Sequence, residues 1–453
     1  MGTLYQSPTK STSPNIIQDL KVTIHDTTTI FPPKGTETET GPMFLSNIDQ
    51  VLNFNVETVH FFVANPQFPP SLVAEKLKSA LSKALVPYSF LAGRLRLNPE
   101  SKRFEFDCNG AGARFVEGSS EFELAEIGNL VYPNPGFKQL VVKSYDDLDI
   151  ADKPLCILQL TSFKCGGFAI GVATNHATFD GLSFKTFLEN LASLAADKPL
   201  ATIPCNDRRL LAARSPPDVQ FDHPELLKIP KEIDIPNPTV FDCQDELDFK
   251  IFGLTSKDIA HLKQKAKDET GSTRAKITGF NVVTAHVWRC KALSSGADYD
   301  PDRVSTVLYA VDVRSRLNLP RSFAGNAVLS AYASAPCKAI EESPFSKLVE
   351  LMTEGVSRMT AEYARSVIDW GEVNKGFPFG EFLISSWWRL GFADVEYPWG
   401  KPRYCCPVVY RRKDIILLFP DIAGETENEV NVLVALPSNE MEKFEALFHK
   451  FLA

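Results

Sequence analysis

A proline-rich stretch near the middle of the chain separates two segments of similar length. Its prolines stand at positions 199, 204, 216, 217, 224, 230, 236 and 238. Because proline lacks a backbone donor and fixes φ, such a stretch suits neither a long helix nor a central strand. The chain has 453 residues, more than the roughly 250 to 300 at which a single core stops growing. We therefore predict an N-terminal half at 1–196, a crossover linker at 197–242 and a C-terminal half at 243–453.

Both halves mix strand and helix patterns. Residues 51–63 alternate β-branched and aromatic side chains with polar ones, as strands do, whereas apolar residues in 70–85 recur at helical spacing. Residues 155–174 hold two apolar runs separated by Gly166 and Gly167, which predicts a hairpin. In the C-terminal half we expect helices over 255–269 and 277–293, and strands over 305–317, 414–422 and 429–437. These patterns indicate the α/β (α+β) class.

The charge and the cysteine pattern argue against several kinds of protein. The formal net charge is −8, whereas binding to nucleic acid requires dense lysine and arginine, so we expect no nucleic-acid partner. The nine cysteines contain no CxxC pair and no zinc-like spacing, which indicates a reducing compartment and no metal site. No stretch approaches about 18 uninterrupted apolar residues, and the start lacks a signal-peptide core. We expect a cytoplasmic protein with no membrane span.

The segment 175–181, NHATFDG, holds the strongest candidate for a catalytic residue. His176 directly follows the predicted hairpin, Asp180 comes four positions later, and Gly181 precedes a predicted helix. Imidazole, with an ordinary pKa of about 6.5, is mostly neutral and yet basic near pH 7, as removal of a proton from an alcohol or amine requires. The pattern alone is more typical of a core histidine with a nearby capping aspartate than of a catalytic site. Its place in a loop after a buried strand favours catalysis.

Further segments match one known family in the same order. They read LSNIDQ from 45, LAGRL from 91, DCNGAG from 107, NHATFDGLS from 175, DRRLLAARSPP from 207, TAHVWRCKA from 284, VDVRSRL from 311 and LVALP from 433. On these segments the chain resembles the plant BAHD acyltransferases over essentially its whole length. The resemblance implies two similar-sized chloramphenicol-acetyltransferase-like domains, each a mixed sheet flanked by helices, with a solvent channel between them.

The resemblance also implies a reaction. Acyl-CoA would be a co-substrate rather than a permanently bound cofactor, and no metal would be needed. His176 would act as general base on a hydroxyl or amine acceptor, which then attacks the thioester in a ternary complex. A hydroxycinnamoyl or acetyl group would pass to a plant specialised metabolite, a lipid alcohol or a hydroxy acid, by O-acylation or, with an amine, N-acylation. We expect the enzyme to be a monomer.

The resemblance gives Asp180 and Gly181 a structural role beside the base. The family's aspartate turns away from the channel and pairs with an arginine of the second domain. Arg314 and Arg316 are the candidates, and as alternate residues of the predicted strand 305–317 they would face the same way. We favour Arg314. Both arginines are equally compatible with solvated or surface-paired positions.

A second family motif, usually DFGWG, reads EYPWG at 396–400 and departs at three positions. Glu396 keeps the charge on a longer side chain, and Pro398 removes a backbone donor and fixes φ. Trp399 and Gly400 are retained. Because the motif is structural in the family, we expect activity to survive the departure. The departure puts in question a role for Trp399 as a donor near the reacting carbonyl.

The other histidines are interpreted as non-catalytic. His60 and His286 lie inside a predicted strand and a predicted helix, so we expect structural roles. The remaining four stand among polar residues and are expected to be exposed: His25, His223, His261 and His449. Two alternatives to an acyltransferase stay open, a non-catalytic ligand-binding or scaffold protein of the same fold and a thioesterase-like hydrolase.

Overall fold

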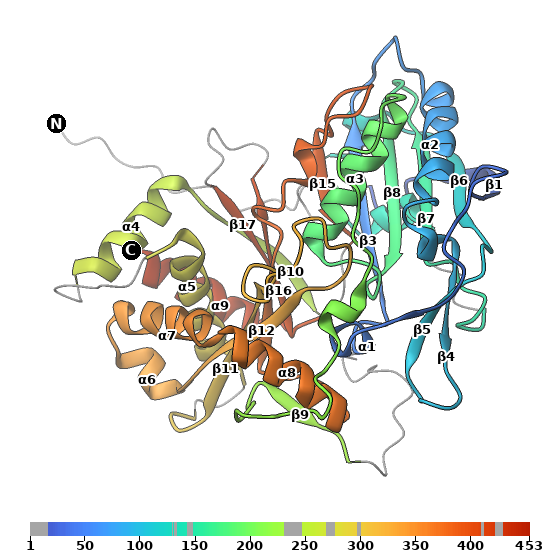
Figure 1. Cartoon of the computed structure of the whole chain (residues 1–453). Coiled ribbons are helices and arrows are strands. Elements are labelled where there is room, and N and C mark those ends of the chain that lie inside the picture. Colours follow the sequence, from blue (N-terminus) through green and yellow to red (C-terminus); the bar gives the residue numbers. More distant parts are fainter. Residues whose placement is uncertain are drawn as a thin grey trace, which may run out of the picture.

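Two six-stranded mixed sheets stand side by side, each with helices packed against it (Figure 1). The computed structural model describes residues 17–128, 130, 134–142, 148–230, 247–268, 277–296, 300–408, 412–421 and 429–453. The predicted α/β (α+β) class is confirmed. Residues 231–242 of the predicted linker lie outside the described residues, and the domain boundaries stay a prediction.

The first sheet contains the predicted hairpin. Its strands in spatial order are β1 (Val22–Ile30), β6 (Ala113–Ser120), β7 (Cys156–Ser162), β8 (Phe168–Asn175), β3 (Asn55–Phe62) and β15 (Tyr404–Pro407). The β6–β7 pair is parallel and the others are antiparallel. In the turn between β7 and β8, Gly166 has a φ of +81°, a conformation that glycine adopts without strain.

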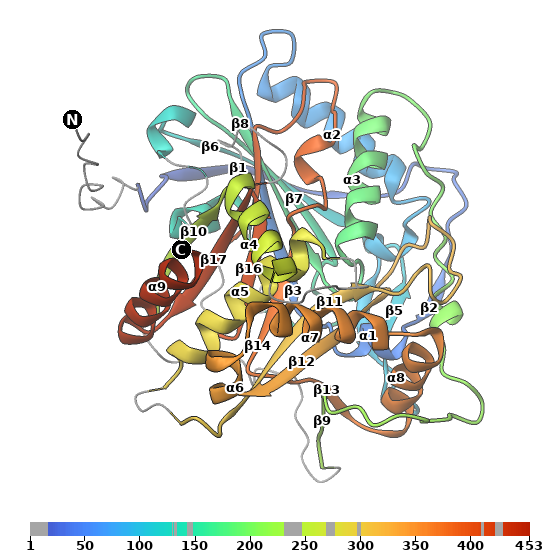
Figure 2. The ribbon, with the colours of Figure 1, turned by 90° about the vertical axis from the view of Figure 1, so that its left-hand side faces the viewer.

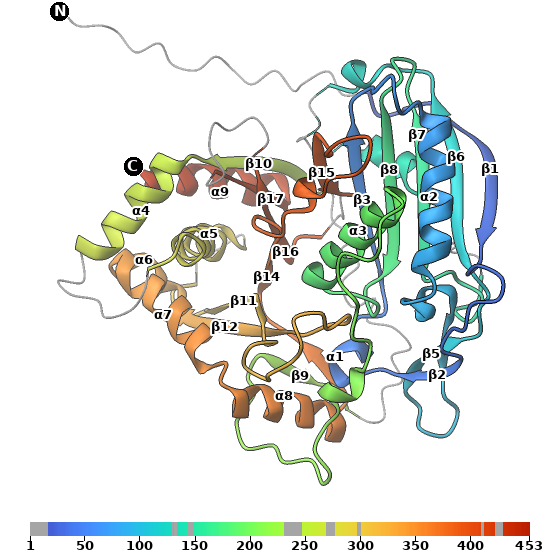
Figure 3. The same cartoon turned by 45° about the horizontal axis from the view of Figure 1, so that its top comes forward.

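Helices α2 (Pro70–Ala84) and α3 (Gly181–Ala195) cover one face of this sheet (Figure 3). Leu81 of α2 and Leu191 of α3 are buried in the same core cluster as Ile170 of β8. Apolar residues at helical spacing place one stripe of each helix against the strands. A second cluster fills the opposite face of the sheet. The strand that ends at Asn175 is therefore buried on both faces, which fixes the residue that follows it.

The second sheet belongs to the C-terminal half. Its strands in spatial order are β10 (Asp248–Leu254), β17 (Val430–Leu436), β16 (Ile415–Pro420), β14 (Phe382–Ser386), β11 (Val304–Asp312) and β12 (Val328–Pro336). The helices in its core cluster include α4 (Ser256–Asp268), α5 (Gly279–Ser294), α6 (Cys337–Glu342), α7 (Phe345–Arg358) and α9 (Ser438–Leu452). In Figure 2 these helices lie in front of the sheet, on the side that faces away from the N-terminal half.

Shorter elements complete the fold. They are the sheet of β2 (Gly41–Phe44), β5 (Phe104–Cys108) and β4 (Arg94–Leu97), the pair β9 (Leu226–Lys228) and β13 (Gly376–Pro378), the helices α1 (Asn47–Gln50) and α8 (Ala361–Val373), and the 3₁₀ turns η1 (Ser89–Ala92), η2 (Leu124–Ile127), η3 (Pro135–Leu140), η4 (Arg208–Leu211) and η6 (Phe392–Asp394). Among the described helices, none has both the length and the apolar character needed to cross a bilayer.

The strand β15 joins the two halves. In the chain it lies between β14 and β16 of the second sheet, yet it pairs antiparallel with β3 of the first sheet. The register runs from Tyr404 opposite Phe61 to Pro407 opposite Thr58. β15 thereby covers the edge of β3, which would otherwise present unpaired backbone groups.

The described part of the proline-rich stretch is held against α8. Arg214 Nε donates to Asp369 Oδ2 at 2.5 Å, and His223 Nε2 lies 2.9 Å from Ser366 Oγ. Glu225 Oε1 accepts from Tyr363 Oη at 2.8 Å. The prediction that His223 is exposed is therefore wrong. Its sequence neighbours are polar, but its ring is buried in this interface.

Two further histidines are buried within the predicted elements. His60 lies in β3, with Nδ1 2.9 Å from Cys405 Sγ and Nε2 3.0 Å from Thr58 Oγ1. Burial lowers the pKa of His60 to about 4. His286 lies in α5 against the ring of Phe448, and burial lowers its pKa to about 3. Both imidazoles are therefore neutral at pH 7.

Candidate active site

The loop 175–180 begins where β8 ends. His176 N donates to Phe54 O at 2.7 Å, which extends the pairing of β8 with β3 by one bond. Asn175 Oδ1 accepts from Ala177 N at 3.0 Å, and Thr178 Oγ1 donates to Asn175 O at 2.6 Å. These bonds turn the chain directly after the strand. The turn places the His176 side chain at the end of a rigid element.

Asp180 ends the loop and caps the helix that follows. Its Oδ1 accepts from Ser183 N at 2.9 Å, and its Oδ2 accepts from Ala327 N at 2.9 Å. Arg314 pairs with both carboxylate oxygens, Nη2 with Oδ1 at 2.9 Å and Nη1 with Oδ2 at 2.8 Å. Such a bidentate pair fixes direction as well as charge. Asp180 thus connects α3 to residues of the C-terminal half.

The structure corrects where the two candidate arginines lie. Strand β11 ends at Asp312, so Arg314 and Arg316 stand in the turn beyond it and not in the predicted strand. Arg314 points to Asp180, whereas Arg316 Nη1 donates to Asp312 O at 2.9 Å. The structure therefore pairs Arg314 with Asp180. It places Arg316 elsewhere.

Gly181 lies close to a neighbouring side chain and has an ordinary helical backbone. It is the first residue of α3 and does not have a positive φ. A Cβ at this position would lie 2.5 Å from Leu390 Cδ1, so a larger residue would require the Leu390 side chain to shift. Leu390 follows β14 of the second sheet. Gly181 is thus a site of close approach between the two halves.

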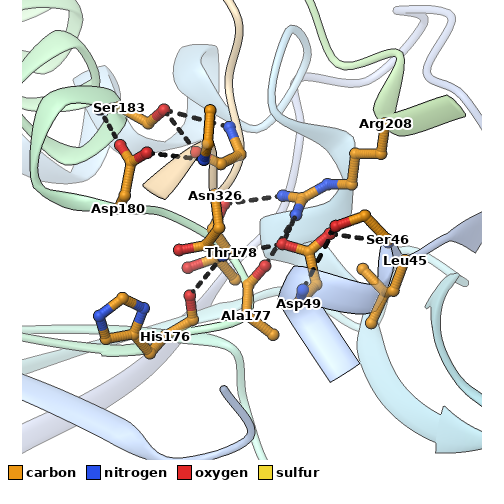
Figure 4. A network of polar contacts seen from close by, with 12 residues as sticks. Leu45, Ser46, Asp49, His176, Ala177, Thr178, Asp180, Ser183, Arg208 and Asn326 are labelled. Carbon is orange, nitrogen blue, oxygen red and sulfur yellow. Dashed lines mark hydrogen bonds and ion pairs between the residues drawn. The ribbon is translucent and has the colours of Figure 1, made fainter. Parts of the chain in front are cut away.

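Three residues that the sequence did not single out hold the backbone of the loop (Figure 4). Asn326 Nδ2 donates to His176 O at 2.9 Å. Arg208 Nη1 donates to Ala177 O at 2.8 Å, and its Nη2 donates to Thr178 O at 2.7 Å. Asp49 Oδ1 accepts from Arg208 at 2.9 Å and from Asn326 at 2.8 Å. Three consecutive carbonyls after the strand are therefore each bound by a side chain.

The elements that supply this network are distant in sequence. Asp49 lies on α1, Arg208 on η4 of the crossover and Asn326 just before β12. The Arg208 and Asp49 side chains are each only 1% exposed. Because water is excluded from this pair, removing one partner would leave a buried charge without compensation and cost much of the stability. The crossover is thus part of the active-site support and not only a connection.

The His176 ring combines a buried side with an accessible one. Nδ1 is fully buried, whereas the residue as a whole is only half-buried. The ring of Phe54 lies 5.1 Å away between centroids, tilted by 56°. Burial is the main reason that the pKa of His176 is lowered, while its own backbone, Asp180, Asn326 and Asp49 oppose the shift. The ring is therefore a neutral base at pH 7.

The EYPWG loop lies at the other end of the sheet from His176. Trp399 packs against Phe62 and Phe168, and these two residues face each other in the β3–β8 pair. Phe168 and Asn175 are separated by the length of β8, about 23 Å at about 3.3 Å per residue. Trp399 is too distant to donate to a carbonyl held at His176.

The remaining residues of this loop have structural surroundings. Tyr397 and Gly400 exchange two backbone hydrogen bonds, at 3.2 and 2.9 Å, which closes a tight turn. Gly400 has a φ of +113°, a conformation that side chains disfavour. Glu396 is exposed. The loop therefore contributes to the core of the first sheet and not to the chemistry at His176.

Comparison with known proteins gives the same picture. The family model described as Transferase family matches residues 20–450. The chain is 58% identical to Acyltransferase GLAUCE of Arabidopsis thaliana over 100% of both chains, and 33% identical to Omega-hydroxypalmitate O-feruloyl transferase of the same plant over 91% of this chain and 90% of that one.

Two solved structures share the fold. Vinorine synthase, 23% identical, aligns over 93% of this chain and 96% of its own with a TM-score of 0.71. TRI101 of F. graminearum in complex with coenzyme A and deoxynivalenol, 14% identical, aligns over 89% and 97% with a TM-score of 0.73. The match to the family model and the full-length relatives show which family the chain belongs to. The chain belongs to the Transferase family of acyltransferases, the BAHD family, and is an acyltransferase.

Proposed function

We propose that the enzyme transfers an acyl group from an acyl-CoA thioester to the hydroxyl group of a small-molecule acceptor. The observation that carries this proposal is the neutral imidazole of His176, which is fixed at a strand end and belongs to a half-buried residue. Such a group accepts a proton from an alcohol without needing a second base. Cytosolic location and a monomeric state belong to the same proposal.

The steps follow from the chemistry of a neutral base. Nε2 of His176 takes the proton of the acceptor hydroxyl while the hydroxyl oxygen attacks the thioester carbonyl. The tetrahedral intermediate collapses with cleavage of the C–S bond. The departing thiolate takes the proton back from the imidazolium, so that His176 is neutral again. Binding both substrates in line converts a bimolecular step into an effectively unimolecular one.

The relatives favour a hydroxycinnamoyl donor. Omega-hydroxypalmitate O-feruloyl transferase and Fatty alcohol:caffeoyl-CoA acyltransferase of Arabidopsis thaliana are 33% and 32% identical to this chain. Their names describe aromatic acyl groups on long-chain alcohols. We therefore propose feruloyl- or caffeoyl-CoA as donor and a lipid alcohol or hydroxy acid as acceptor, with acetyl transfer as the second candidate.

A donor and acceptor screen tests this function. Purified enzyme is incubated with feruloyl-, caffeoyl-, p-coumaroyl- or acetyl-CoA, with and without a long-chain alcohol, an ω-hydroxy acid or shikimate. We expect release of free thiol that requires an acceptor, together with an ester of matching mass. Thiol release without acceptor would identify a hydrolase instead. The absence of release with every pair would favour the scaffold alternative.

Phe54 is expected to contact a substrate. It immediately precedes β3, its ring lies against His176, and 44% of the residue is exposed. Loss of this apolar surface in Phe54→Ala should raise KM for the preferred apolar substrate about tenfold, since tenfold corresponds to about 1.4 kcal/mol of binding. Initial-rate kinetics with donor and acceptor varied in turn measure this effect.

Phe31→Ala is the matched control. Phe31 is 53% exposed and follows β1, which lies three strands away from β8 in the sheet. Its replacement should leave both KM values unchanged. If Phe54→Ala also leaves every KM and kcat at the wild-type value, Phe54 does not contact the substrates.

A further inference from the structure

We propose that one apolar surface beside α8 docks on a lipid bilayer that contains anionic lipids, from which the enzyme takes a long-chain alcohol acceptor. This inference rests on the proposed function, because it names where a lipid acceptor is held before it reaches His176. The surface, called the β9–β13 patch below, consists of Val219, Phe221, Leu227, Val373 and Phe379.

Exposed large apolar side chains are concentrated in this patch. The five residues are 39 to 49% exposed, and they are five of the sixteen large apolar residues that are exposed in the described part of the chain. They nevertheless fall within two short segments, 219–227 and 373–379. Single exposed apolar residues are normal on a protein surface, whereas several grouped together indicate an interaction site.

Short contacts bring the two segments together beside α8. Leu227 lies in β9, which pairs with β13, and Phe379 N donates to Glu225 O at 2.8 Å. The ring of Phe221 lies 5.3 Å from the ring of Tyr363 between centroids, and Tyr363 Oη donates to Glu225 Oε1 at 2.8 Å. α8 and β9 lie at the lower margin of the molecule (Figures 1 and 2). The patch is therefore one surface built from two parts of the chain.

Buried hydrogen bonds hold the patch from beneath. Gln220 N and Phe221 N donate to Ser366 Oγ at 3.0 and 3.3 Å. His223 connects Ser366 Oγ, 2.9 Å from its Nε2, to Glu225 Oε1, 3.2 Å from its Nδ1. Ser366, His223 and Glu225 are all buried. Because the backbone under the apolar side chains is already fixed, little order has to be gained when the patch meets a partner.

Two lysines at the border of the patch favour an anionic lipid surface as that partner. Lys228 lies in β9 and Lys375 lies between α8 and β13, and both are exposed. The carboxylate of Glu372 is compensated by Arg103 at 3.1 Å, and Asp222 adds one opposing charge. Apolar side chains flanked by lysine match the boundary between acyl chains and anionic headgroups.

The position of the patch relative to the active site suits delivery of a lipid acceptor. α8 contacts α1, where Asn47 Nδ2 donates to Ile368 O at 2.8 Å. α1 also carries Asp49, which belongs to the network around the His176 loop. A long-chain alcohol partitions from water into a bilayer, because its methylene groups are then removed from water. Docking would hold the enzyme where such an acceptor is concentrated.

Sedimentation with vesicles tests the docking without any need for activity. The full chain is mixed with vesicles of phosphatidylcholine alone or with added phosphatidylglycerol, at low and high salt. We expect binding to the anionic vesicles that weakens at high salt. Leu227→Ser with Phe379→Ser should lower the partition coefficient at least about tenfold. Lys228→Glu with Lys375→Glu should lower it by a similar factor on anionic vesicles, without changing the apolar side chains.

Phe31→Ser with Val63→Ser is the matched control. Both residues are 53% exposed and flank strands of the first sheet, so they lie outside the patch. Their replacement removes as much exposed apolar surface and should leave vesicle binding unchanged. A loss of binding equal to that of the patch variants would mean that general hydrophobicity and not the patch causes binding.

The remaining outcomes decide between lipid and other partners. No binding of the wild-type chain to any vesicle, or equal binding by both patch variants, would overturn the proposal. A dimer in sedimentation velocity that the same substitutions dissociate, without vesicle binding, would assign the patch to a second copy of the chain and overturn it as well. If Leu227→Ser with Phe379→Ser does not fold, the lysine variant decides.

Activity measurements keep this proposal separate from the proposed function. With a water-soluble short-chain alcohol, the patch variants should retain the wild-type kcat/KM, because the patch does not contact His176. With a long-chain alcohol held in anionic vesicles, their rates should fall at least about tenfold. Failure of acyl transfer to every alcohol would refute the proposed function, whereas vesicle binding would still decide the docking.

Discussion

His176→Ala should lower the turnover of acyl transfer by at least about a hundredfold, because general-base catalysis contributes about 10² to 10⁴. His176 is placed by β8, and its loop carbonyls are bound by Asn326 and Arg208. Alanine keeps these backbone contacts and removes only the imidazole. We therefore expect an almost unchanged melting temperature together with the loss of kcat. Initial rates of ester formation and a thermal unfolding curve measure the two quantities.

His261→Ala is the control for this experiment. His261 is exposed on α4, in the helical layer on the far side of the second sheet. It should retain wild-type kinetics. A wild-type rate in His176→Ala would remove His176 from the mechanism. A lost rate together with a greatly lowered melting temperature would indicate misfolding rather than loss of a base.

Arg208→Met should lower the free energy of unfolding by about 3 to 5 kcal/mol, since removing one partner of a buried ion pair leaves the other charge uncompensated. Asp49 would remain buried, and the carbonyls of Ala177 and Thr178 would lose their donors. Methionine retains much of the aliphatic volume next to the rings of Phe90 and Phe106. Denaturant unfolding measures the change, and we expect activity to fall as well because the loop that carries His176 loses its support.

Arg209→Met separates this effect from a general loss of charge. Arg209 is the next residue in the same 3₁₀ turn and is exposed. Its replacement should change the free energy of unfolding by less than about 0.5 kcal/mol. Equal stability of both variants would mean that the ion pair with Asp49 contributes nothing measurable.

The hairpin and the loop after it could be predicted because their signals are local. Apolar runs on both sides of Gly166 and Gly167 define β7 and β8, and His176 follows the last strand residue. A structural role for the separate EYPWG motif at 396–400 was also predicted, despite its departure from DFGWG. Tyr397 and Trp399 pack in the core of the first sheet, which agrees with a structural role for EYPWG.

The supporting network could not be predicted from local patterns. Asp49, Arg208 and Asn326 are polar residues from three distant segments, and only the packing of the two halves brings them to one loop. The one signal was that Asp49 and Arg208 fall in segments shared with the family, LSNIDQ and DRRLLAARSPP. His223 was misjudged for the same reason, because hydrophilic neighbours in sequence do not reveal contact with α8. The end of β11 was placed too late since VDVRSRL continues the strand-like alternation beyond Asp312.

The position of β15 limits how this enzyme can be recombined with its relatives. A chimera joined within the crossover would carry β15 with its C-terminal parent, and that strand would have to pair with β3 of the other parent. Compatibility therefore depends on four residue pairs, from Tyr404 opposite Phe61 to Pro407 opposite Thr58. An exchange that moves β15 together with the N-terminal parent's sheet would preserve this match. Such an exchange would leave β3 paired on both sides, with β15 and with the strand β8 that leads to His176.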